Sequence, residues 1–274
     1  MRVVSFNVNS IRVRLHQLEA VIQTHNPDII GLQETKVTDE DFPLDNIKEL
    51  GYEVIYHGQK AHYGVAMLSR KPALEVTKGL PRGAPDSQRR FVAGKFRLDD
   101  DRILTAINGY YPQGENRSHA AKFPAKEKYY ADVHDYLMKH CSPRDPVIVM
   151  GDMNVAPVDF DIGIGEANRK RWLKDGKTSF LPEERDWLAR ITDWGLFDSF
   201  RFHHAKTDDR FSWFDYRSRG FDKNPRRGLR IDLILVSNVL QGMSVDAGID
   251  YDIRAMDRPS DHCPIWSELA LNLA

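Results

Sequence analysis

Long apolar runs and cysteine are scarce in this 274-residue sequence. No stretch of about 18 apolar residues occurs, which argues against a membrane-spanning helix. Only Cys141 and Cys263 are present, and they do not form a Cys-x-x-Cys pair, so neither a disulfide framework nor a cysteine-rich zinc site is expected. Residues 3–6 are apolar and follow Met1 without a charged leader, so we expect a cytoplasmic protein rather than a secreted one.

Net charge is also nearly absent, because 39 Lys and Arg face 40 Asp and Glu. This balance argues against a generally cationic nucleic-acid coat. Residues 201–230 nevertheless contain nine basic residues and four Asp, which leaves the rest of the chain with about six net negative charges. A cationic segment on an anionic protein favours a docking surface for a polyanion, although a solvated basic loop gives the same pattern.

Short, continuous apolar runs predict strands that are covered on both faces. The runs are residues 3–6, 29–32, 65–68, 103–107, 147–150 and 233–236. Helical spacing connects three further sets: Ile11, Leu15, Leu18 and Ile22 after a Ser10 cap; Tyr129, Val133 and Leu137; and Trp187, Ile191 and Trp194 after Pro182. No repeat and no Gly-, Ser- or Pro-rich linker divides the chain, so we expect an α/β fold in which residues 1–274 form one domain.

Polar side chains stand at the ends of these predicted strands. They are Asn7 and Asn9; Gln33 and Glu34; Asn108, Tyr110 and Tyr111; Asp152 and Asn154; Asp232; and Asp261 and His262. A single Asn or Asp after a strand usually forms a turn, and Asn9 is best explained in that way. The coincidence at several strand ends, rich in carboxylates and amides, instead favours a hard cation such as Mg²⁺, since zinc would require more His and Cys.

Eight segments in a fixed order carry a more specific signal. They are SFNVNSIR (5–12), LQETK (32–36), YHGQKAHYGVA (56–66), INGYYPQGE (107–115), MGDMNVAP (150–157), RFSWFDYRSRGFD (210–222), GLRIDLIL (228–235) and PSDHCPIW (259–266). Together they resemble the exonuclease III family of DNA repair nucleases, within the wider superfamily of Mg²⁺-dependent phosphodiesterases. The resemblance implies a four-layer α-β-β-α sandwich: two mixed β-sheets packed face to face with helices outside, and the site at one edge.

The resemblance also implies a metal centre that holds Mg²⁺, for which Mn²⁺ would substitute. Its implied ligands are Asn7, Glu34, Asp152, Asn154 and Asp261. The metal would neutralise the phosphodiester and stabilise charge on the leaving oxygen. If the chain remains extended after residue 150, the side chains of Asp152 and Asn154 would lie on the same side.

The implied catalytic residues are Tyr110, Asp152, Asn154, Asp232 and His262. Asp152 would be the general base that activates the attacking water, and Asn154 would donate a hydrogen bond to the transition state. Tyr110 would contact the phosphate or assist the leaving group, whereas Tyr111 fits a core tyrosine with a bonded hydroxyl. Asp232 would orient His262 for donation to the phosphate.

The implied DNA-binding residues are Gln113, Arg169, Lys170, Trp213, Arg217, Leu229, Ile231 and His262. Trp213, Leu229 and Ile231 would wall an apolar pocket that admits a deoxyribose without a base and excludes a normal nucleotide. The alternation in residues 211–217 also fits an ordinary strand and loop, the less favoured alternative. The stretch 223–227 departs from the family pattern by being longer and more basic, and Cys263 stands where a small apolar residue is expected.

These observations predict a Mg²⁺-dependent DNA repair nuclease. It would act on double-stranded DNA as a 3′→5′ exonuclease, an abasic-site (AP) endonuclease and a 3′-phosphatase. We expect a monomer that has no obligate protein partner and does not bind a membrane. A phosphatase or phospholipase of the same superfamily is the second hypothesis, against which the aromatic and basic segment 210–230 argues. A nucleic-acid-binding regulator that has lost catalysis is the third, and the complete set of site residues argues against it.

Overall fold

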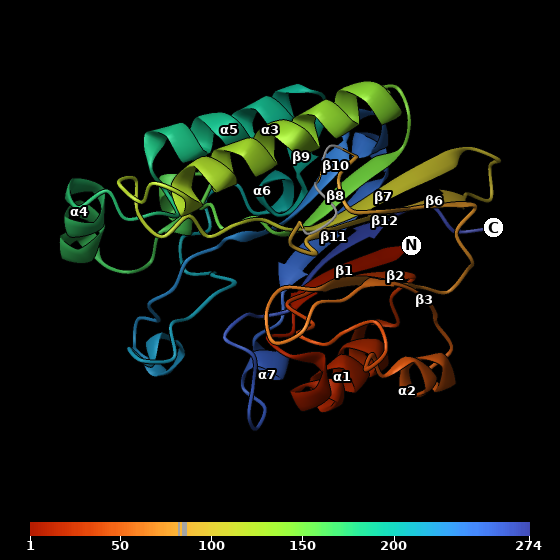
Figure 1. Cartoon of the computed structure of the whole chain (residues 1–274), viewed down its shortest axis with the longest axis horizontal. Coiled ribbons are helices and arrows are strands. Elements are labelled where there is room, and N and C mark those ends of the chain that lie inside the picture. Colours follow the sequence, from red (N-terminus) through yellow and green to blue (C-terminus); the bar gives the residue numbers. More distant parts are fainter. Residues whose placement is uncertain (82, 84–86) are drawn as a thin grey trace.

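Two six-stranded β-sheets form the centre of the computed structural model, which describes residues 1–81, 83 and 87–274 (Figure 1). The first sheet has the spatial order β11 (Ser244–Ile249), β12 (Ile265–Leu269), β1 (Arg2–Asn7), β2 (Ile29–Gln33), β4 (Val65–Ser69) and β3 (Glu53–His57). The second has the order β5 (Glu75–Lys78), β6 (Phe91–Arg97), β7 (Ile103–Tyr110), β8 (Val147–Asp152), β10 (Asp232–Ser237) and β9 (Leu196–Asp198). All six predicted strands are therefore confirmed.

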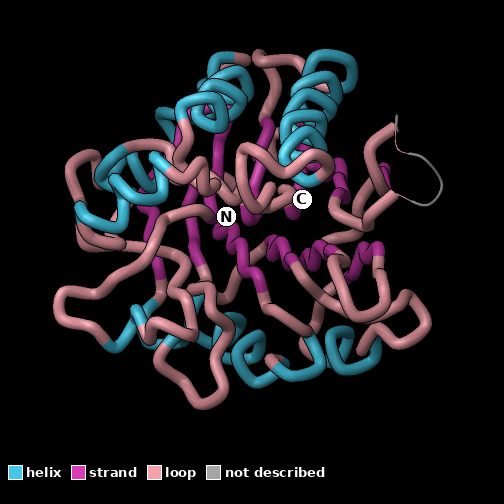
Figure 2. The backbone as a smooth tube through the Cα atoms, turned by 60° about the vertical axis from the view of Figure 1, so that its left-hand side comes forward, coloured by secondary structure: helices cyan, strands magenta, loops and turns pink. Residues whose placement is uncertain are grey.

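Each central strand is covered on both faces, as its continuous apolar sequence requires. In β1, Val3 packs into the core between the sheets, whereas its neighbour Val4 packs toward the helices outside. Ile148 and Val149 of β8 divide in the same way between the central core and the outer helical layer. Figure 2 shows strands in the middle and helices above and below them, so the predicted four-layer sandwich is confirmed.

The α-helices lie outside the two sheets, most of them in two outer layers (Figure 1). They are α1 (Leu15–His25), α2 (Leu44–Glu49), α3 (Lys122–His140), α4 (Glu166–Lys174), α5 (Pro182–Asp193), α6 (Ser199–His203) and α7 (Tyr251–Arg254). Short 3₁₀ helices are η1 (Ile11–Val13), η2 (Asp159–Asp161), η3 (Gly220–Asp222) and η4 (Asn238–Met243). No described helix is both long and apolar enough to span a membrane.

The helix predictions hold with one correction. Helices α3 and α5 carry the predicted apolar faces, and Pro182 opens α5, where the missing N–H of proline costs nothing. Ser10, in contrast, does not cap the first helix: its side chain makes no capping bond, and its φ of 88° turns the chain into η1 before α1 begins at Leu15. Two backbone bonds, Ser10 N–Glu34 O at 2.8 Å and Ile11 N–Thr35 O at 3.1 Å, join this turn to the loop after β2.

Strand direction brings the predicted site residues to one edge. Strands β1 and β2 are parallel, so Asn7 and Glu34 leave the first sheet together. In the second sheet β8 is antiparallel to β10, and their register places Asp232 opposite Asp152. Strand β12 runs antiparallel to β1, so the segment that precedes it, with His262, returns to the same edge. Topology thus gathers residues that are up to 255 positions apart in the sequence.

Candidate active site

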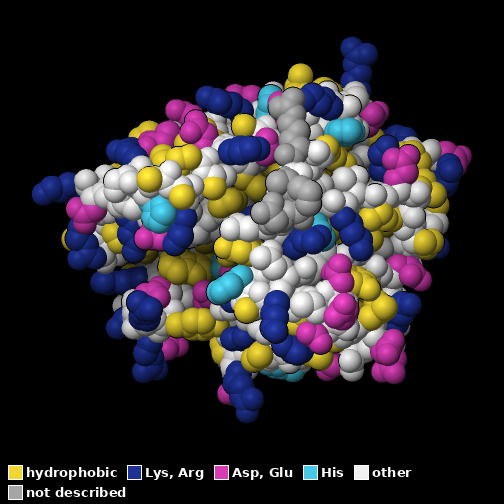
Figure 3. Space-filling model, viewed as in Figure 1, with side chains coloured by type: hydrophobic (Ala, Val, Ile, Leu, Met, Phe, Trp, Pro, Cys, Tyr) yellow, Lys and Arg dark blue, Asp and Glu magenta, His cyan; other side chains and the backbone are white. Residues whose placement is uncertain are grey.

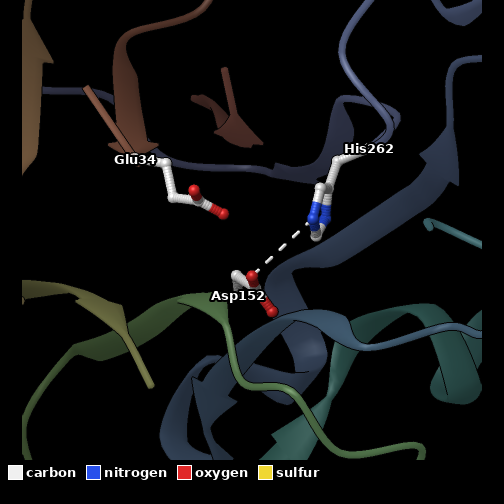
Figure 4. Close-up of side chains that lie close together, drawn as sticks. All are labelled: Glu34, Asp152 and His262. Carbon is white, nitrogen blue, oxygen red and sulfur yellow. Dashed lines mark ion pairs between the residues drawn. The ribbon is translucent and has the colours of Figure 1, made fainter. Parts of the chain in front are cut away.

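Glu34, Asp152 and His262 point toward one another from three different elements (Figure 4). One potential ligand atom from each lies within 4.8 Å of the others. Asn7 binds two of them: its Nδ2 donates to Glu34 Oε1 at 2.9 Å and to Asp152 Oδ2 at 3.0 Å. We call Asn7, Glu34, Asp152, Asp232 and His262 the acidic centre.

Tight backbone turns aim these side chains. Glu34 and Asn154 both have positive φ, 52° and 53°, a conformation that non-glycine residues rarely adopt outside functional turns. The chain is therefore not extended after β8, so the condition for the expected same-side placement is not met, although Asp152 and Asn154 both line the cleft described below. Asn154 N instead donates to Asp152 Oδ1 at 3.0 Å, and its Nδ2 donates to Tyr111 O at 3.0 Å. Gly151 permits the close approach of β7, because a Cβ there would lie 1.9 Å from the Gly109 carbonyl oxygen.

Asp152 and Glu34 have opposite pKa shifts. Burial, assisted by the negative charges of Asp232 and Glu34, raises the pKa of Asp152 to about 8, although His262 opposes the shift. Burial also acts to raise the pKa of Glu34, but the ammonium of Lys36, at 2.9 Å from Glu34 Oε2, outweighs it and lowers that pKa. Asp152 therefore holds its proton more readily than an ordinary carboxyl, whereas Glu34 remains ionised more readily.

Asp232 and His262 form the predicted pair. Both are almost fully buried, and His262 Nδ1 lies 2.9 Å from Asp232 Oδ2. Burial acts to lower the pKa of His262, but Asp232 and Asp152 outweigh it and raise that pKa to about 10. His262 Nε2 lies 3.8 Å from Asp152 Oδ2, so the imidazole joins the two carboxylates.

Ser212 supports this pair and was not among the predicted residues. Its Oγ donates to Asp232 Oδ2 at 2.6 Å and accepts from the backbone N–H groups of Ile231 and Asp232, both at 3.0 Å. The segment around it, residues 211–217, is a loop with isolated bridges rather than a strand. Only its position in the FSW motif pointed toward the site.

The neighbouring tyrosines have different surroundings. Tyr110 lines the cleft, and burial together with the charges of Glu34 and Asp152 raises its pKa well above the ordinary value. The Arg90 guanidinium lies 4.5 Å from its ring centroid. Tyr111 is a core residue as expected, but its buried hydroxyl has no hydrogen-bond partner among the described residues, so the expected bonded hydroxyl is wrong.

Asp261 lies beside the acidic centre but is bonded elsewhere. Its Oδ1 accepts from Asn9 Nδ2 at 2.8 Å, and its Oδ2 accepts from Trp213 Nε1 at 3.0 Å. Asn9 adopts a turn conformation with φ 42°, as interpreted from the sequence, and its Oδ1 also accepts from Lys36 Nζ. Asn9 therefore has a site contact that the turn interpretation missed.

A cleft of about 680 Å³ opens over the acidic centre. Trp213, Leu229 and Ile231 belong to one apolar cluster beside it, together with Ile164 of the facing segment. Gln113 and Arg217 line the same cleft, and Gln113 Nε2 donates to Thr178 Oγ1 at 3.0 Å. Figure 3 shows this face hollowed between α4 and the loop that carries η3, with basic side chains around the opening.

Five exposed cations line the cleft, and we call them the cationic rim. They are Arg171, Lys177, Arg217, Lys223 and Arg227. Within the described part of the chain, none of them forms an ion pair with a carboxylate. The predicted Arg169 and Lys170 do not line the cleft: Arg169 pairs with Asp159 at 2.6 Å, and Lys170 pairs with Glu166 at 3.4 Å. Helix α4 instead turns Asn168 and Arg171 toward it.

Lys126 is a fully buried cation that the sequence did not reveal as part of the site. Its Nζ donates to Asn154 O at 2.8 Å, to Gln113 O at 3.3 Å and to Glu184 Oε1 at 2.5 Å. Glu184 in turn accepts from the backbone N–H groups of Ser179 and Leu181. This pair fixes three loops beside the cleft. No sequence motif distinguished Lys126 from the exposed lysines of α3.

The donor set of the acidic centre fits a divalent cation. Carboxylate and amide groups predominate, as hard cations prefer, and the imidazole of His262 is already held by Asp232. Burial first, and then the charges of Asp232 and Glu34, raise the pKa of Asp152, and a bound cation would favour its ionised form.

Comparisons with known proteins agree with this geometry. Residues 4–262 match the endonuclease/exonuclease/phosphatase family. The chain belongs to this family. It is 55% identical to exodeoxyribonuclease III of Haemophilus influenzae, over 98% of this chain and 99% of that protein. The chain thus resembles its relative over essentially the full length of both.

Solved structures show the same similarity. A variant of the 3′ phosphatase NExo from Neisseria, bound to a product DNA hairpin, matches with a TM-score of 0.87 and 33% identity over 98% of this chain and 99% of that chain. An AP endonuclease from Archaeoglobus fulgidus matches with a TM-score of 0.87 and 31% identity over the same shares. The predicted resemblance to the exonuclease III family, and with it the prediction of an enzyme of this type, is confirmed.

Proposed function

We propose that the protein is a DNA repair nuclease that hydrolyses phosphodiesters in double-stranded DNA. It removes nucleotides in the 3′→5′ direction, cleaves the backbone at abasic sites and removes 3′ phosphates. One observation carries the proposal: the acidic centre lies at the base of a cleft that also holds an apolar wall and an unpaired cationic rim. The relatives named for exonuclease, AP endonuclease and 3′ phosphatase activities support all three reactions.

Glu34 and Asp152 would hold Mg²⁺, with Asn154 beside them and Mn²⁺ as a substitute. Asn7 would join them by turning its amide, because its Nδ2 donates to both carboxylates and its Oδ1 accepts from Asn9 N. When bound, the cation supplies charge neutralisation to the phosphodiester and its leaving oxygen. Asp261 would take part only by exchanging its bonds to Asn9 and Trp213. We therefore propose that Asp261 lies outside the immediate contacts of the ion, although the sequence-based expectation included it among the ligands.

Asp152 accepts the proton of the attacking water in this mechanism. Burial acts to raise its pKa and so favours proton uptake, whereas a bound cation would favour the ionised form that can accept the proton. His262 keeps its Nδ1 on Asp232, and its Nε2, which lies 3.8 Å from Asp152 Oδ2, would donate to a phosphate oxygen. Asn154 and the Tyr110 hydroxyl are the neutral groups available to stabilise the reacting phosphate and leaving oxygen.

Recognition of DNA divides between the apolar wall and the cationic rim. Trp213, Leu229 and Ile231 offer an apolar surface at which a sugar that lacks its base can be buried. Arg217 and Gln113 face the duplex, and the rim holds backbone phosphates. Arg169 and Lys170 would contact phosphates only outside the cleft, after releasing Asp159 and Glu166.

A nuclease assay tests the proposal on a duplex that carries one abasic site and one recessed 3′ end. We expect incision and 3′ shortening with Mg²⁺, and loss of both with a chelator. Binding to the abasic duplex without cleavage in excess Mg²⁺ would identify a regulator instead. Faster hydrolysis of an inositol phosphate than of the duplex would identify a phosphatase of the same superfamily.

We also propose that residues 1–274 act as one catalytic domain, as a monomer in the cytoplasm. The two sheets pack against one common core, which supports a single folding unit. Cys141 and Cys263 are free thiols, which suits a reducing compartment. Light scattering at the concentration of the nuclease assay would reveal any stable dimer.

A further inference from the structure

A buried ion network lies directly behind the apolar wall. Arg230 stands between Leu229 and Ile231 but is only 1% exposed. Its Nε and Nη2 donate to the two oxygens of Asp161 at 2.6 and 3.1 Å, and its Nη1 and Nη2 donate to the two oxygens of Asp198 at 3.2 and 2.5 Å. Arg201 completes the network by pairing with Asp161.

This network joins the two sides of the pocket. Asp161 ends η2 and is followed by Ile162 and Ile164, which pack in the same apolar cluster as Leu229 and Ile231. Three backbone contacts link the segments: Arg230 N donates to Asp161 O at 3.0 Å, Gly163 N donates to Gly228 O at 2.9 Å, and Ile162 bridges to Leu229. The guanidinium therefore fixes one end of a short paired ribbon whose apolar side chains face the cleft.

Stability alone does not explain why charged side chains occupy this buried position, because a buried ion pair often adds little to the free energy of unfolding. Removing two arginines and two carboxylates from water is costly, and apolar residues often replace such networks without loss of stability. The planar guanidinium instead fixes the orientation of the Arg230 side chain, because it binds two carboxylates at the same time. Asp198 is also fixed, because it caps α6 through bonds to the N–H groups of Phe200 and Arg201.

We propose that Arg230 is a positioning residue that determines substrate specificity. It holds Leu229 and Ile231 at a set distance from Ile164, so that the pocket accepts a baseless deoxyribose and excludes a sugar that still carries its base. The inference rests on the proposed function. Arg230 itself faces away from the cleft and does not touch the substrate, so its effect is on recognition rather than on the chemical step.

Two substitutions test this role. Arg230→Lys retains the charge but cannot bind both carboxylates bidentately, and Arg230→Met removes the charge. We expect KM for incision of an abasic duplex to rise roughly tenfold or more in each, with kcat at saturation within about twofold of wild type. With a chelator present, the preference in Kd for an abasic over an intact duplex should fall by a similar factor.

Arg70→Met is the matched control, because Arg70, just after β4, stacks on Tyr52 at 4.1 Å, and neither residue lines the cleft. Thermal unfolding checks that the Lys variant remains folded. The inference is overturned if both Arg230 variants keep the abasic preference of wild type, or if kcat falls while KM and the preference stay unchanged. Failure of wild type to incise the abasic duplex would instead reject the proposed function.

Discussion

The acidic centre and the cationic rim face the same cleft but are built in opposite ways. The acidic centre is buried, comes from strand ends of both sheets, and its side chains bond one another through Asn7 and Asp232. The cationic rim is exposed, comes from α4 and the loops on either side of the cleft, and its members have no carboxylate partners in the described structure.

This difference gives the two groups of charges different functions. Buried charges at fixed distances act strongly on a ligand and on one another, so the acidic centre suits chemistry. Exposed charges are screened and mobile, so the cationic rim suits attraction of a polyanion whose exact position varies. Basic residues just outside the cleft, such as Arg169 and Lys170, are neutralised by neighbouring acids, which restricts the attraction to the cleft itself.

The largest expected effect concerns the acidic centre. Asp152→Asn preserves shape but removes the base, so kcat for abasic incision should fall by about two to four orders of magnitude. Steady-state kinetics measure it, with Asp186→Asn on the exposed face of α5 as the control. Near-wild-type nuclease rates in a folded Asp152→Asn protein would contradict the assigned role.

A second large effect should appear in stability. Lys126→Met leaves Glu184 buried without its cation, so the free energy of unfolding should fall by about 3–5 kcal/mol. Denaturant unfolding measures this change, and Lys128→Met, which removes an exposed pair on the same helix, should leave the midpoint almost unchanged. An equal loss of unfolding free energy in the two variants would contradict a special contribution of the buried ion pair.

The cationic rim should respond to salt rather than to the chemical step. Arg227→Gln should weaken DNA binding and reduce the slope of log K against log salt by about one, with kcat unchanged. Lys170→Gln should change the slope less, because Lys170 is paired with Glu166 and lies outside the cleft. Binding titrations at several salt concentrations measure both slopes, and an equal reduction in the two would remove the distinction between cleft and flanking cations.

The smallest expected effect is an acid sensitivity of the buried network. Burial acts to raise the pKa of Asp161, but Arg230 and Arg201 outweigh it and lower that pKa. The stabilisation is therefore complete above the unfolded carboxyl pKa, near 3.8, and is lost as the pH falls through the lower folded value. Unfolding free energies measured from pH 5 downward should decline more steeply in wild type than in Asp161→Asn. Parallel curves would show that Asp161 does not titrate with folding.

Much of the acidic centre was predictable, because polar residues at strand ends stand out against continuous apolar runs. Glu34, Asp152 and His262 were identified in this way, together with the family resemblance, and the structure brings them together. Their bonding was less predictable. Asp261 follows the same sequence signal, yet its carboxylate is held by Asn9 and Trp213, since the direction of a side chain depends on partners from distant segments.

The positions on helices and loops were the least predictable. Consecutive basic residues on α4 looked equivalent in sequence, but the helix turns about 100° per residue and directs Arg171 to the cleft and Arg169 to Asp159. Lys126 and Arg230 look like ordinary surface cations in the sequence. Their roles exist only because α3 and the segment before β10 are covered by other parts of the chain.

The sequence by itself determined six of the twelve described strands, three helical apolar faces and the polar residues at those strand ends, because apolar periodicity and strand-end chemistry are local properties. The layered arrangement was expected only from the family resemblance. Tertiary structure alone decided which of those polar groups face one another and which buried cations hold the surrounding loops in place. Such pairings depend on strand direction and register between segments that lie far apart in the chain, and no local pattern encodes them.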